Sequence, residues 1–321
     1  CAAMSRSSDR AAILGSGLIG RAWAIAFARA GWTCALWDPQ PGAPEQALRE
    51  IDRLLADLAE GDLLRGRRPA EVLARIEVAG SLAEAMRGAA WAQESAPERI
   101  EVKLDLWRAI DAAAEAGTIL ASSSSAIVPS RFTESLAARQ RCLVAHPINP
   151  PYLIPAVELV PAPWTAAETM ARAAEIMRAI GQAPIVMRRE IDAFVMNRMQ
   201  GALLEEAFRL VADGVCSVED VDTGIRDGLA LRWSFMGPFE TIDLNAPGGV
   251  ADYIQRYQGI YERLFPQMQR RVDWAGGVLA TVERERRQRL PESGLADRQR
   301  WRDRRLMALL RHKAKAADEI G

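Results

Sequence analysis

Short apolar runs alternate with longer helical patterns through the first half of the chain. The runs at 11–15 and 33–37 flank an almost wholly apolar segment at 18–30. This arrangement predicts two buried strands joined by a helix that packs on a sheet. A further helix is expected at 43–60, after a stretch interrupted by prolines and Gly42. The alternation therefore predicts a parallel sheet with covering helices.

The same alternation continues to about residue 187 and then stops. Strands are expected at 76–78, 89–93, 118–121, 141–145, 156–160 and 184–187, and helices at 98–116 and 165–180. Thr165 is expected to cap the second helix and Gly181 to end it. From Asp192 onward only helical periodicity is found. The sequence thus predicts an α/β fold, with a Rossmann-type doubly wound sheet in residues 1–189 and an all-α C-terminal domain in residues 190–321.

Composition and charge exclude several classes of protein. The 321 residues carry 41 Lys+Arg against 42 Asp+Glu, which gives a net charge of −1 and no electrostatic reason to bind nucleic acid. No apolar stretch reaches roughly 18 residues, so no membrane span is expected. The first ten residues lack the apolar core of a signal peptide, and Met4 is expected to be the native start. The four cysteines, at positions 1, 34, 142 and 216, are widely spaced and are expected to be reduced, which favours a cytoplasmic location.

The chain contains only two histidines, His146 and His312. A site built from several histidines is therefore excluded, and no metal site is expected. His312 lies in a C-terminal segment of mixed charge that is typical of exposed helices, and we assign it no function.

A glycine-rich turn, GSGLIG, follows the first predicted strand and opens the first predicted helix. In this context Gly15 permits a tight turn, Gly17 lets the backbone approach a pyrophosphate, and Gly20 lets the helix pack close to the strand. The amides of Leu18 and Ile19 are expected to face the pyrophosphate at the helix N-terminus. The alternative is a tight turn that binds no nucleotide.

An acid at the end of the second strand indicates which dinucleotide is bound. Asp38 lies 18 residues after Gly20, close to the spacing at which an acid accepts hydrogen bonds from the adenosine ribose. No arginine follows it in DPQPG, so there is no evident partner for a 2′-phosphate. NAD is therefore favoured over NADP.

Polar residues also follow two later strands, where open α/β sheets bind ligands. Ser122–Ser125 form one cluster, and His146 follows the next strand, with Glu158 in the strand after it. A carboxylate within an apolar strand needs a partner, and His146 is the only histidine in the domain. A neutral imidazole oriented by a carboxylate could take the proton of a secondary alcohol as hydride leaves for a nicotinamide, with Ser125 bonding the same hydroxyl. The alternatives are a helix-capping serine run, a structural histidine and a surface glutamate.

Six motifs in order resemble the 3-hydroxyacyl-CoA dehydrogenase superfamily, in its lambda-crystallin/L-gulonate 3-dehydrogenase branch. They lie within residues 10–265 and read GSGLIG, ESAPERIEVK, SSSSAIVPS, VAHPINPPYLIPAVELV, FVMNRMQ and LRWSFMGPFETIDLNAPGG. The resemblance implies NAD as cofactor and a homodimer formed through the helical domain. It also implies the roles of individual residues: His146 as catalytic base, Glu158 as its partner, Ser125 and Asn197 at the substrate, Ser124 and Asn149 in substrate binding, and Leu18, Ile19, Asp38, Glu98 and Lys103 at NAD.

Without the resemblance, Glu98 and Lys103 would be interpreted as an ordinary acid at a helix N-terminus and a solvated base. Lys103 is one of only three lysines, and the other two, Lys313 and Lys315, lie near the C-terminus.

The substrate is the least determined feature. Arg232 and Trp233 stand before MGPFE, where the acyl-CoA enzymes have small residues, and an arginine can hold a free carboxylate bidentately. We therefore expect oxidation of the 3-hydroxyl of a small free 3-hydroxy acid, as by an L-gulonate 3-dehydrogenase. Three alternatives remain: a CoA ester bound by the arginines at 65, 67 and 68, carnitine held against Trp233 through a cation–π contact, and a crystallin-like structural protein that binds NAD. Arg232 could equally be a surface or interface arginine.

Overall fold

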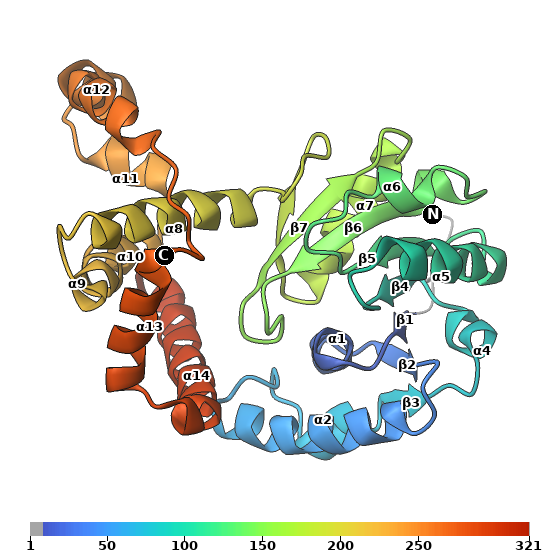
Figure 1. Cartoon of the computed structure of the whole chain (residues 1–321). Helices are drawn as coiled ribbons and strands as arrows, with labels where there is room; N and C mark the ends of the chain where they lie inside the picture. The colour runs from blue at the N-terminus through green and yellow to red at the C-terminus, as the bar shows by residue number, and fades with distance from the viewer. Residues whose placement is uncertain (1–8, 321) are drawn as a thin grey trace. The chain divides into compact units, whose positions relative to one another are not determined.

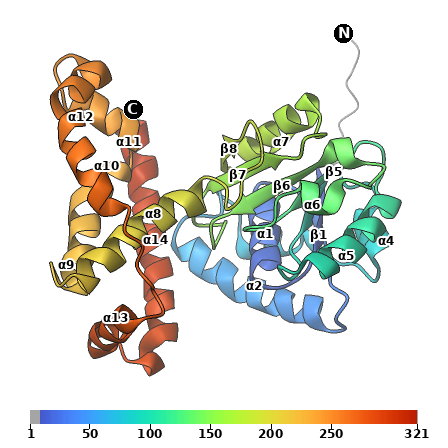
Figure 2. The same cartoon turned by 45° about the horizontal axis from the view of Figure 1, so that its top comes forward.

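The structure is a computed structural model that describes residues 9–320. Its chain forms two compact units: the first comprises Cys1–Met196 with Asp303–Gly321, and the second comprises Asn197–Arg302. The expected native start at Met4 lies outside the described residues. Figure 1 and Figure 2 show the helices and strands of both units, most of them labelled.

The first unit is built on an eight-stranded sheet in the order β3-β2-β1-β4-β5-β6-β7-β8. Strands β1 to β6 pair in parallel, β7 is antiparallel to β6, and β8 is parallel to β7. The first six strands have the order of a dinucleotide-binding fold, with the switch point between β1 and β4. The strands are β1 Arg10–Leu14, β2 Thr33–Trp37, β3 Ile76–Val78, β4 Trp91–Glu94, β5 Ile119–Ser122, β6 Cys142–Pro147, β7 Ala156–Pro161 and β8 Ala183–Val186.

Helices cover both faces of this sheet, and each face has its own buried cluster. Alternate strand residues such as Ile13 and Leu36 pack on one face with α1, α2, α7 and Met307 of α14, whereas Leu14 and Ala35 pack on the other with α4, α5 and α6. The helices of this unit are α1 Leu18–Arg29, α2 Ala43–Glu60, α3 Pro69–Leu73, α4 Leu82–Met86, α5 Ile100–Ala113, α6 Ser130–Thr133, the 3-10 turn η1 Arg139–Arg141 and α7 Ala167–Ala179.

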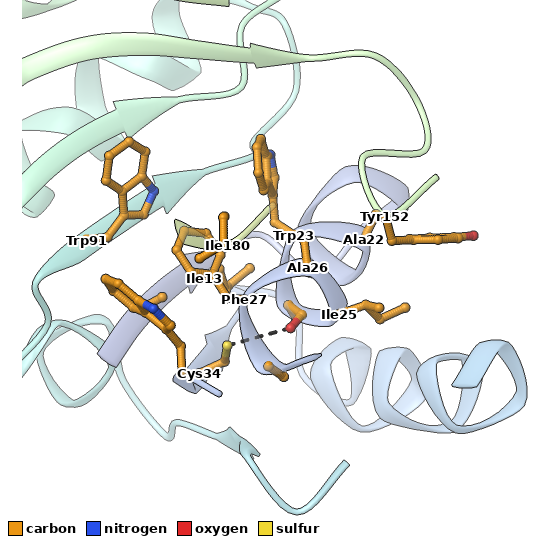
Figure 3. Close-up of a cluster of buried hydrophobic side chains, with 14 of the residues drawn as sticks. Ile13, Ala22, Trp23, Ile25, Ala26, Phe27, Cys34, Trp91, Tyr152 and Ile180 are labelled. Carbon is orange, nitrogen blue, oxygen red and sulfur yellow. Dashed lines mark hydrogen bonds between the residues drawn. The ribbon is translucent and has the colours of Figure 1, made fainter. Parts of the chain in front are cut away.

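Aromatic rings fill the centre of the first face (Figure 3). Phe27 of α1 lies 6.0 Å from Trp23 and 6.2 Å from Trp91 between ring centroids, and Trp32 meets it edge-on at 5.2 Å. All but Trp32 are fully buried. Because most of the other buried positions of α1 are alanine or glycine, the helix can approach the sheet closely and hold the glycine turn at the edge of β1.

The second unit is entirely helical in its described residues. Arg209 is buried in it, donates to the carbonyl of Arg270 and pairs with Glu206, while Phe208 stacks on Trp274 at 4.9 Å. Its elements are α8 Met196–Ala212, α9 Val218–Thr223, the π-helix η2 Gly224–Leu229, α10 Ala230–Trp233, α11 Pro238–Leu244, α12 Gly249–Met268, α13 Gly277–Arg289, the 3-10 turn η3 Glu292–Gly294 and α14 Leu295–Ile320, whose last part returns to the first unit. None of the helices between residues 9 and 320 is long and apolar enough to cross a membrane.

The predicted α/β sheet and the helical second half are confirmed, with three differences. The sheet is not wholly parallel, because β7 reverses direction. Thr165 does not cap α7; its hydroxyl instead donates to the carbonyl of Cys142, and Ala166 precedes the helix. The chain divides after Met196 rather than after residue 189, and residues from Asp303 onward pack with the first unit, because Met307 enters its core.

Candidate active site

In the glycine turn between β1 and α1, the backbone of Gly15 lies close to that of Gly20. Gly15 has φ +102°, a conformation that side chains disfavour, and a Cβ at Gly20 would lie 1.8 Å from the carbonyl oxygen of Gly15. A Cβ at Gly17, by contrast, would meet nothing within 4 Å. Gly15 and Gly20 therefore build the turn, whereas Gly17 leaves space above it.

The N-terminus of α1 opens into that space. Gly17 precedes the helix without a side-chain capping bond, and the first turn contains no acid. Leu18 is 52% exposed. Free amides and a helix dipole at an uncapped, exposed N-terminus form a site for a negatively charged group.

Asp38 lies at the end of β2 beside this turn. Its Oδ2 accepts from the backbone amide of Ser16 at 2.8 Å and from the Ser16 hydroxyl at 3.0 Å, and its Oδ1 accepts from the amide of Gln40 at 2.9 Å. These bonds fix the carboxylate, which keeps acceptor capacity because two oxygens offer about four lone-pair positions. The open Gly17, the uncapped helix and the fixed Asp38 fit the pyrophosphate and ribose of NAD.

His146 and Glu158 face one another across the only antiparallel strand pair of the described sheet. They are register partners in β6 and β7, and His146 Nδ1 lies 2.7 Å from Glu158 Oε2. Glu158 is fully buried and His146 is 6% exposed. The pairing predicted from the sequence is therefore confirmed in its geometry, and it orients the imidazole with Nε2 directed away from the carboxylate.

The other oxygen of Glu158 is also occupied. Its Oε1 accepts from the backbone amides of Val195 and Met196 at 2.6 and 2.8 Å. Phe194, which is fully buried, packs against the His146 ring at 5.6 Å between centroids. Because both oxygens are bonded, the carboxylate is held in one orientation, as a group that positions a histidine must be.

The four serines at the end of β5 and directly after it have four different surroundings. Ser122 is buried and donates to Glu94 at 2.6 Å. The Ser123 hydroxyl accepts from Trp23 Nε1 at 3.2 Å and from Gln93 Nε2 at 2.8 Å. Ser124 is buried and donates to Glu98 at 2.5 Å, whereas Ser125 is exposed. Ser125 is thus the most exposed member of the run, and its role at the substrate stays a prediction.

Glu98 organises the loop that presents Ser125. Its Oε1 accepts from the Ser124 hydroxyl and from the three successive amides of residues 125, 126 and 127, at 3.1 to 3.2 Å for the amides. Burial acts to raise the pKa of Glu98, but the Ser124 bond, the Lys103 charge and the amides outweigh it and lower the pKa. The carboxylate is therefore held charged beneath the serine loop.

Lys103 is buried, so its interpretation from residues alone as a solvated base is wrong. Its Nζ lies 3.1 and 3.0 Å from the two oxygens of Glu94 and 3.5 Å from Glu98 Oε2. Glu94 also accepts from Trp107 Nε1 at 3.1 Å and from Ser122. Contact of Lys103 with NAD stays a prediction. Its described contacts are ion pairs with Glu94 and Glu98, which support the serine loop.

Sequence reasoning missed Glu94 and Gln93, and it named Ser123 only as a member of the serine run. Gln93 accepts from Trp91 Nε1 at 2.9 Å and donates to Ser123, which links β4 to the serine run. The signal for Glu94 was present, because it is an acid at the end of an apolar strand, as Glu158 is an acid within one. The same reasoning that paired Glu158 would have sought a buried cation for Glu94.

Of the remaining predicted residues, Asn149 belongs to the first unit and the other two belong to the helical unit. Asn149 is exposed in the turn after β6. Asn197 is the second residue of α8 and begins the helical unit. Arg232 is exposed on α10, with Nη1 3.4 Å from Asn245 Oδ1. The roles of these three residues stay predictions.

The three arginines of the basic loop at 65–68 each have a partner within the protein. Arg67 donates to the carbonyl of Arg29 at 2.6 Å, and Arg68 pairs with Glu71 at 2.6 Å. Arg65 donates to the carbonyl of Ala179 at 3.2 Å. Two of the three arginines thus brace neighbouring backbone, and the third forms a local ion pair.

Comparison with known families matches both halves of the chain. Residues 10–191 match the family described as 3-hydroxyacyl-CoA dehydrogenase, NAD binding domain, and residues 194–277 match 3-hydroxyacyl-CoA dehydrogenase, C-terminal domain. The two matches meet close to the division between the two units.

Individual relatives match over nearly the whole chain. The lambda-crystallin homolog of Rattus norvegicus is 40% identical over 304 residues, 94% of this chain and 95% of that protein. The L-carnitine dehydrogenase of a Pseudomonas species is 37% identical, over 93% of this chain and 92% of its own. Among solved structures, the NAD+ dependent dismutase FHMPC 5-dehydrogenase superposes with a TM-score of 0.80 at 26% identity, covering 95% of this chain and 98% of that one.

Proposed function

The chain belongs to the 3-hydroxyacyl-CoA dehydrogenase family of NAD-dependent oxidoreductases, and from that premise we propose that it oxidises the 3-hydroxyl of a small free 3-hydroxy carboxylic acid, as an L-gulonate 3-dehydrogenase does. The observation that carries the proposal is the buried His146–Glu158 pair at 2.7 Å, at the end of β6. When bound, NAD supplies the acceptor for the hydride.

His146 is the catalytic base of this proposal. Its Nδ1 is engaged by Glu158, so the neutral ring keeps the proton on Nδ1 and offers the lone pair of Nε2 to the substrate hydroxyl. As Nε2 takes the proton, the ring becomes cationic, and the adjacent carboxylate stabilises that charge. The amides of Val195 and Met196 hold the carboxylate still while this happens.

Ser125 and Asn197 bind the reacting end of the substrate. The exposed Ser125 hydroxyl, on the loop fixed by Glu98, bonds the same 3-hydroxyl that His146 deprotonates. Asn197 supplies an amide to the substrate, with Ser124 and Asn149 as further binding residues. The bonds of Glu98 to three successive amides support a rigid loop, which is what positioning a hydroxyl within hydrogen-bond reach requires.

Arg232 binds the C1 carboxylate of the substrate. Its guanidinium is exposed, and its hydrogen bond to Asn245 at 3.4 Å is long, so an incoming carboxylate can replace it. A free acid is therefore favoured over a CoA ester, which has no C1 charge.

Carnitine is the second candidate substrate. It is a 3-hydroxy acid with a trimethylammonium group, and Trp233 follows Arg232 on α10. Relatives named L-carnitine dehydrogenase are 37% to 42% identical to this chain. Trp233 could hold the cation through its ring face.

The substrate is tested by following NADH absorbance with L-gulonate, L-3-hydroxybutyrate, L-carnitine and 3-hydroxybutyryl-CoA. We expect the highest kcat/KM with L-gulonate, and R232A is expected to raise its KM roughly 10- to 100-fold, the value of a charged hydrogen-bonded pair. R226A, which removes another exposed arginine of the same unit, should leave KM unchanged. A highest kcat/KM with carnitine, lost in a Trp233→Leu variant, would favour the second candidate; a highest value with the CoA ester would overturn the free-acid proposal.

We further propose that the protein is a homodimer formed through the helical unit. Large apolar side chains are exposed on α10 to α12, among them Leu231 at 65%, Phe235 at 68% and Phe239 at 80%. Such a concentration of exposed apolar surface is typical of an interface. Sedimentation equilibrium should give twice the chain mass of 35.3 kDa, and an F235D/F239D variant should sediment as a monomer. A wild-type protein that sediments as a monomer would contradict the dimer.

A further inference from the structure

One cavity in the first unit contains an arginine that has no acidic partner among the described residues. The cavity measures about 330 Å³ and lies beside the C-terminal end of α1, against the loop at 151–155 and the last turns of α14. Arg29 lies in its wall and is 9% exposed. Neither the residues of the glycine turn nor His146 line this cavity, and none of the residues assigned above to the cofactor, the substrate or proton transfer lines it.

Arg29 donates only to neutral groups. Its Nη1 gives hydrogen bonds to the carbonyl oxygens of Tyr152 at 2.7 Å and Leu63 at 3.4 Å. Its Nε is buried without a hydrogen-bond partner, and within residues 9–320 no carboxylate lies at ion-pair distance from it. Burial, together with the charge of Arg65, lowers the pKa of Arg29 to about 10, in keeping with a guanidinium that lacks a counter-charge.

A second guanidinium faces the same cavity. Arg65 packs its guanidinium against Gly181: a Cβ added at Gly181 would lie 2.0 Å from Arg65 Nη2. Arg65 also donates a hydrogen bond to the carbonyl of Ala179. One acid, Asp62, also lines the cavity, and it forms no ion pair with either arginine among the described residues. Two cations against one anion leave the wall with a positive charge.

The rest of the wall is apolar. Leu63, Leu153 and Pro155 line one part, and Leu310 and Ala314 of α14 line another. Burial of a charged group costs free energy unless an opposite charge pairs with it. A cavity with polar walls alone would suit water or a simple ion. Here a charged end and a hydrocarbon wall occur together, which is the arrangement of a site for an amphipathic anion.

From these contacts we infer that the cavity between α1, the 151–155 loop and α14 binds a small organic anion, a monocarboxylate with a short hydrocarbon chain. The carboxylate meets Arg29 and Arg65, and the chain lies against Leu63, Leu310 and Ala314. The inference does not depend on the proposed dehydrogenase substrate, since it uses none of the residues assigned to that reaction.

Calorimetric titration of the full-length protein, saturated with NAD, with hexanoate tests the inference. We expect one site per chain, with a Kd on the order of 0.1 to 1 mM for so small a ligand. Hexanamide, which has the same shape without the charge, and acetate, which lacks the chain, should each bind at least tenfold more weakly. Equal binding of hexanamide, or absence of any hexanoate binding, would overturn the inference.

Two variants place the ligand in this cavity. R65A removes an exposed guanidinium and A314W fills the apolar part, and each should weaken hexanoate binding at least tenfold while the circular dichroism spectrum is unchanged. R68A, which removes an arginine of the same loop that does not line the cavity, should bind as the wild type does. If R65A and A314W bind normally and R232A does not, hexanoate occupies the substrate site and the cavity is not an anion site.

Discussion

Two buried carboxylates of the nucleotide-binding unit show how single residues shape the site. Glu158 and Glu94 are each 0–1% exposed, and each has both oxygens occupied by hydrogen-bond donors. Glu158 is paired with a titratable imidazole, whereas Glu94 is paired with the ammonium of Lys103. The first arrangement suits proton transfer, because an imidazole oriented by a carboxylate can accept a proton at its second nitrogen. The second suits structural support, because the ammonium is held by both oxygens of Glu94.

Replacement of Lys103 by methionine should show that this lysine supports the site. The variant leaves the buried Glu94 without its cation, and we expect a loss of about 3–5 kcal/mol in the free energy of unfolding, measured by urea denaturation. K313M, which removes an exposed lysine, should change stability by less than about 0.5 kcal/mol. An equally stable K103M protein would show that the Glu94–Lys103 pair contributes nothing to the fold.

The sequence could predict one of these residue pairs but not the other. His146 and Glu158 were predicted as partners because the chain has so few histidines and Glu158 interrupts an apolar strand. Lys103 was not recognised as buried, because it lies in a helix whose pattern also fits a solvated base. Burial of a lysine is decided by which acid the tertiary fold brings to it, here one at the end of a neighbouring strand.

Among the elements, the turn between β1 and α1 contains three glycines, of which Gly15 and Gly20 are required by its backbone geometry and Gly17 is not. A Cβ at Gly20 collides with the backbone of Gly15, but a Cβ at Gly17 points into open space. A substitution at Gly20 should therefore affect folding of the turn, whereas a substitution at Gly17 should affect mainly the binding of a ligand at the turn.

G20A and G17A should give different outcomes. G20A forces the turn apart and is expected to cost about 1–3 kcal/mol or more in unfolding free energy, together with NAD affinity. G17A should cost less than about 1 kcal/mol, yet weaken NAD binding, since the methyl group occupies the approach to the pyrophosphate. Urea denaturation and quenching of tryptophan fluorescence by NADH measure the two effects. If G17A bound NAD normally, the pyrophosphate could not lie over this turn.

Element positions were largely predictable, because the strands of a covered sheet are nearly continuous apolar runs. The runs at 33–37 and 76–78 coincide with β2 and β3. The direction of β7 was not predictable from its pattern, since a buried strand is apolar whichever way it runs. That reversal is what sets Glu158 directly opposite His146.

At the scale of the whole molecule, the chain leaves the nucleotide-binding unit after Met196 and returns to it at Asp303. The return was not foreseen, because α14 carries many charges and only Met307 of it is buried. The same segment forms one wall of the cavity beside Arg29 through Leu310 and Ala314. The end of the helical half is therefore part of the first unit, and sequence periodicity alone does not report such a return.

We propose that His146 takes the proton from a 3-hydroxy acid during NAD reduction. The most direct measurement compares NADH formation from L-gulonate by the wild type, H146Q and H312Q, with NAD affinity determined in parallel. We expect H146Q to lose roughly 100- to 10,000-fold in kcat while its NAD affinity is unchanged. H312Q, which alters the only other histidine, an exposed one on α14, should behave as the wild type. An H146Q protein that still oxidises the acid at the wild-type rate would contradict it.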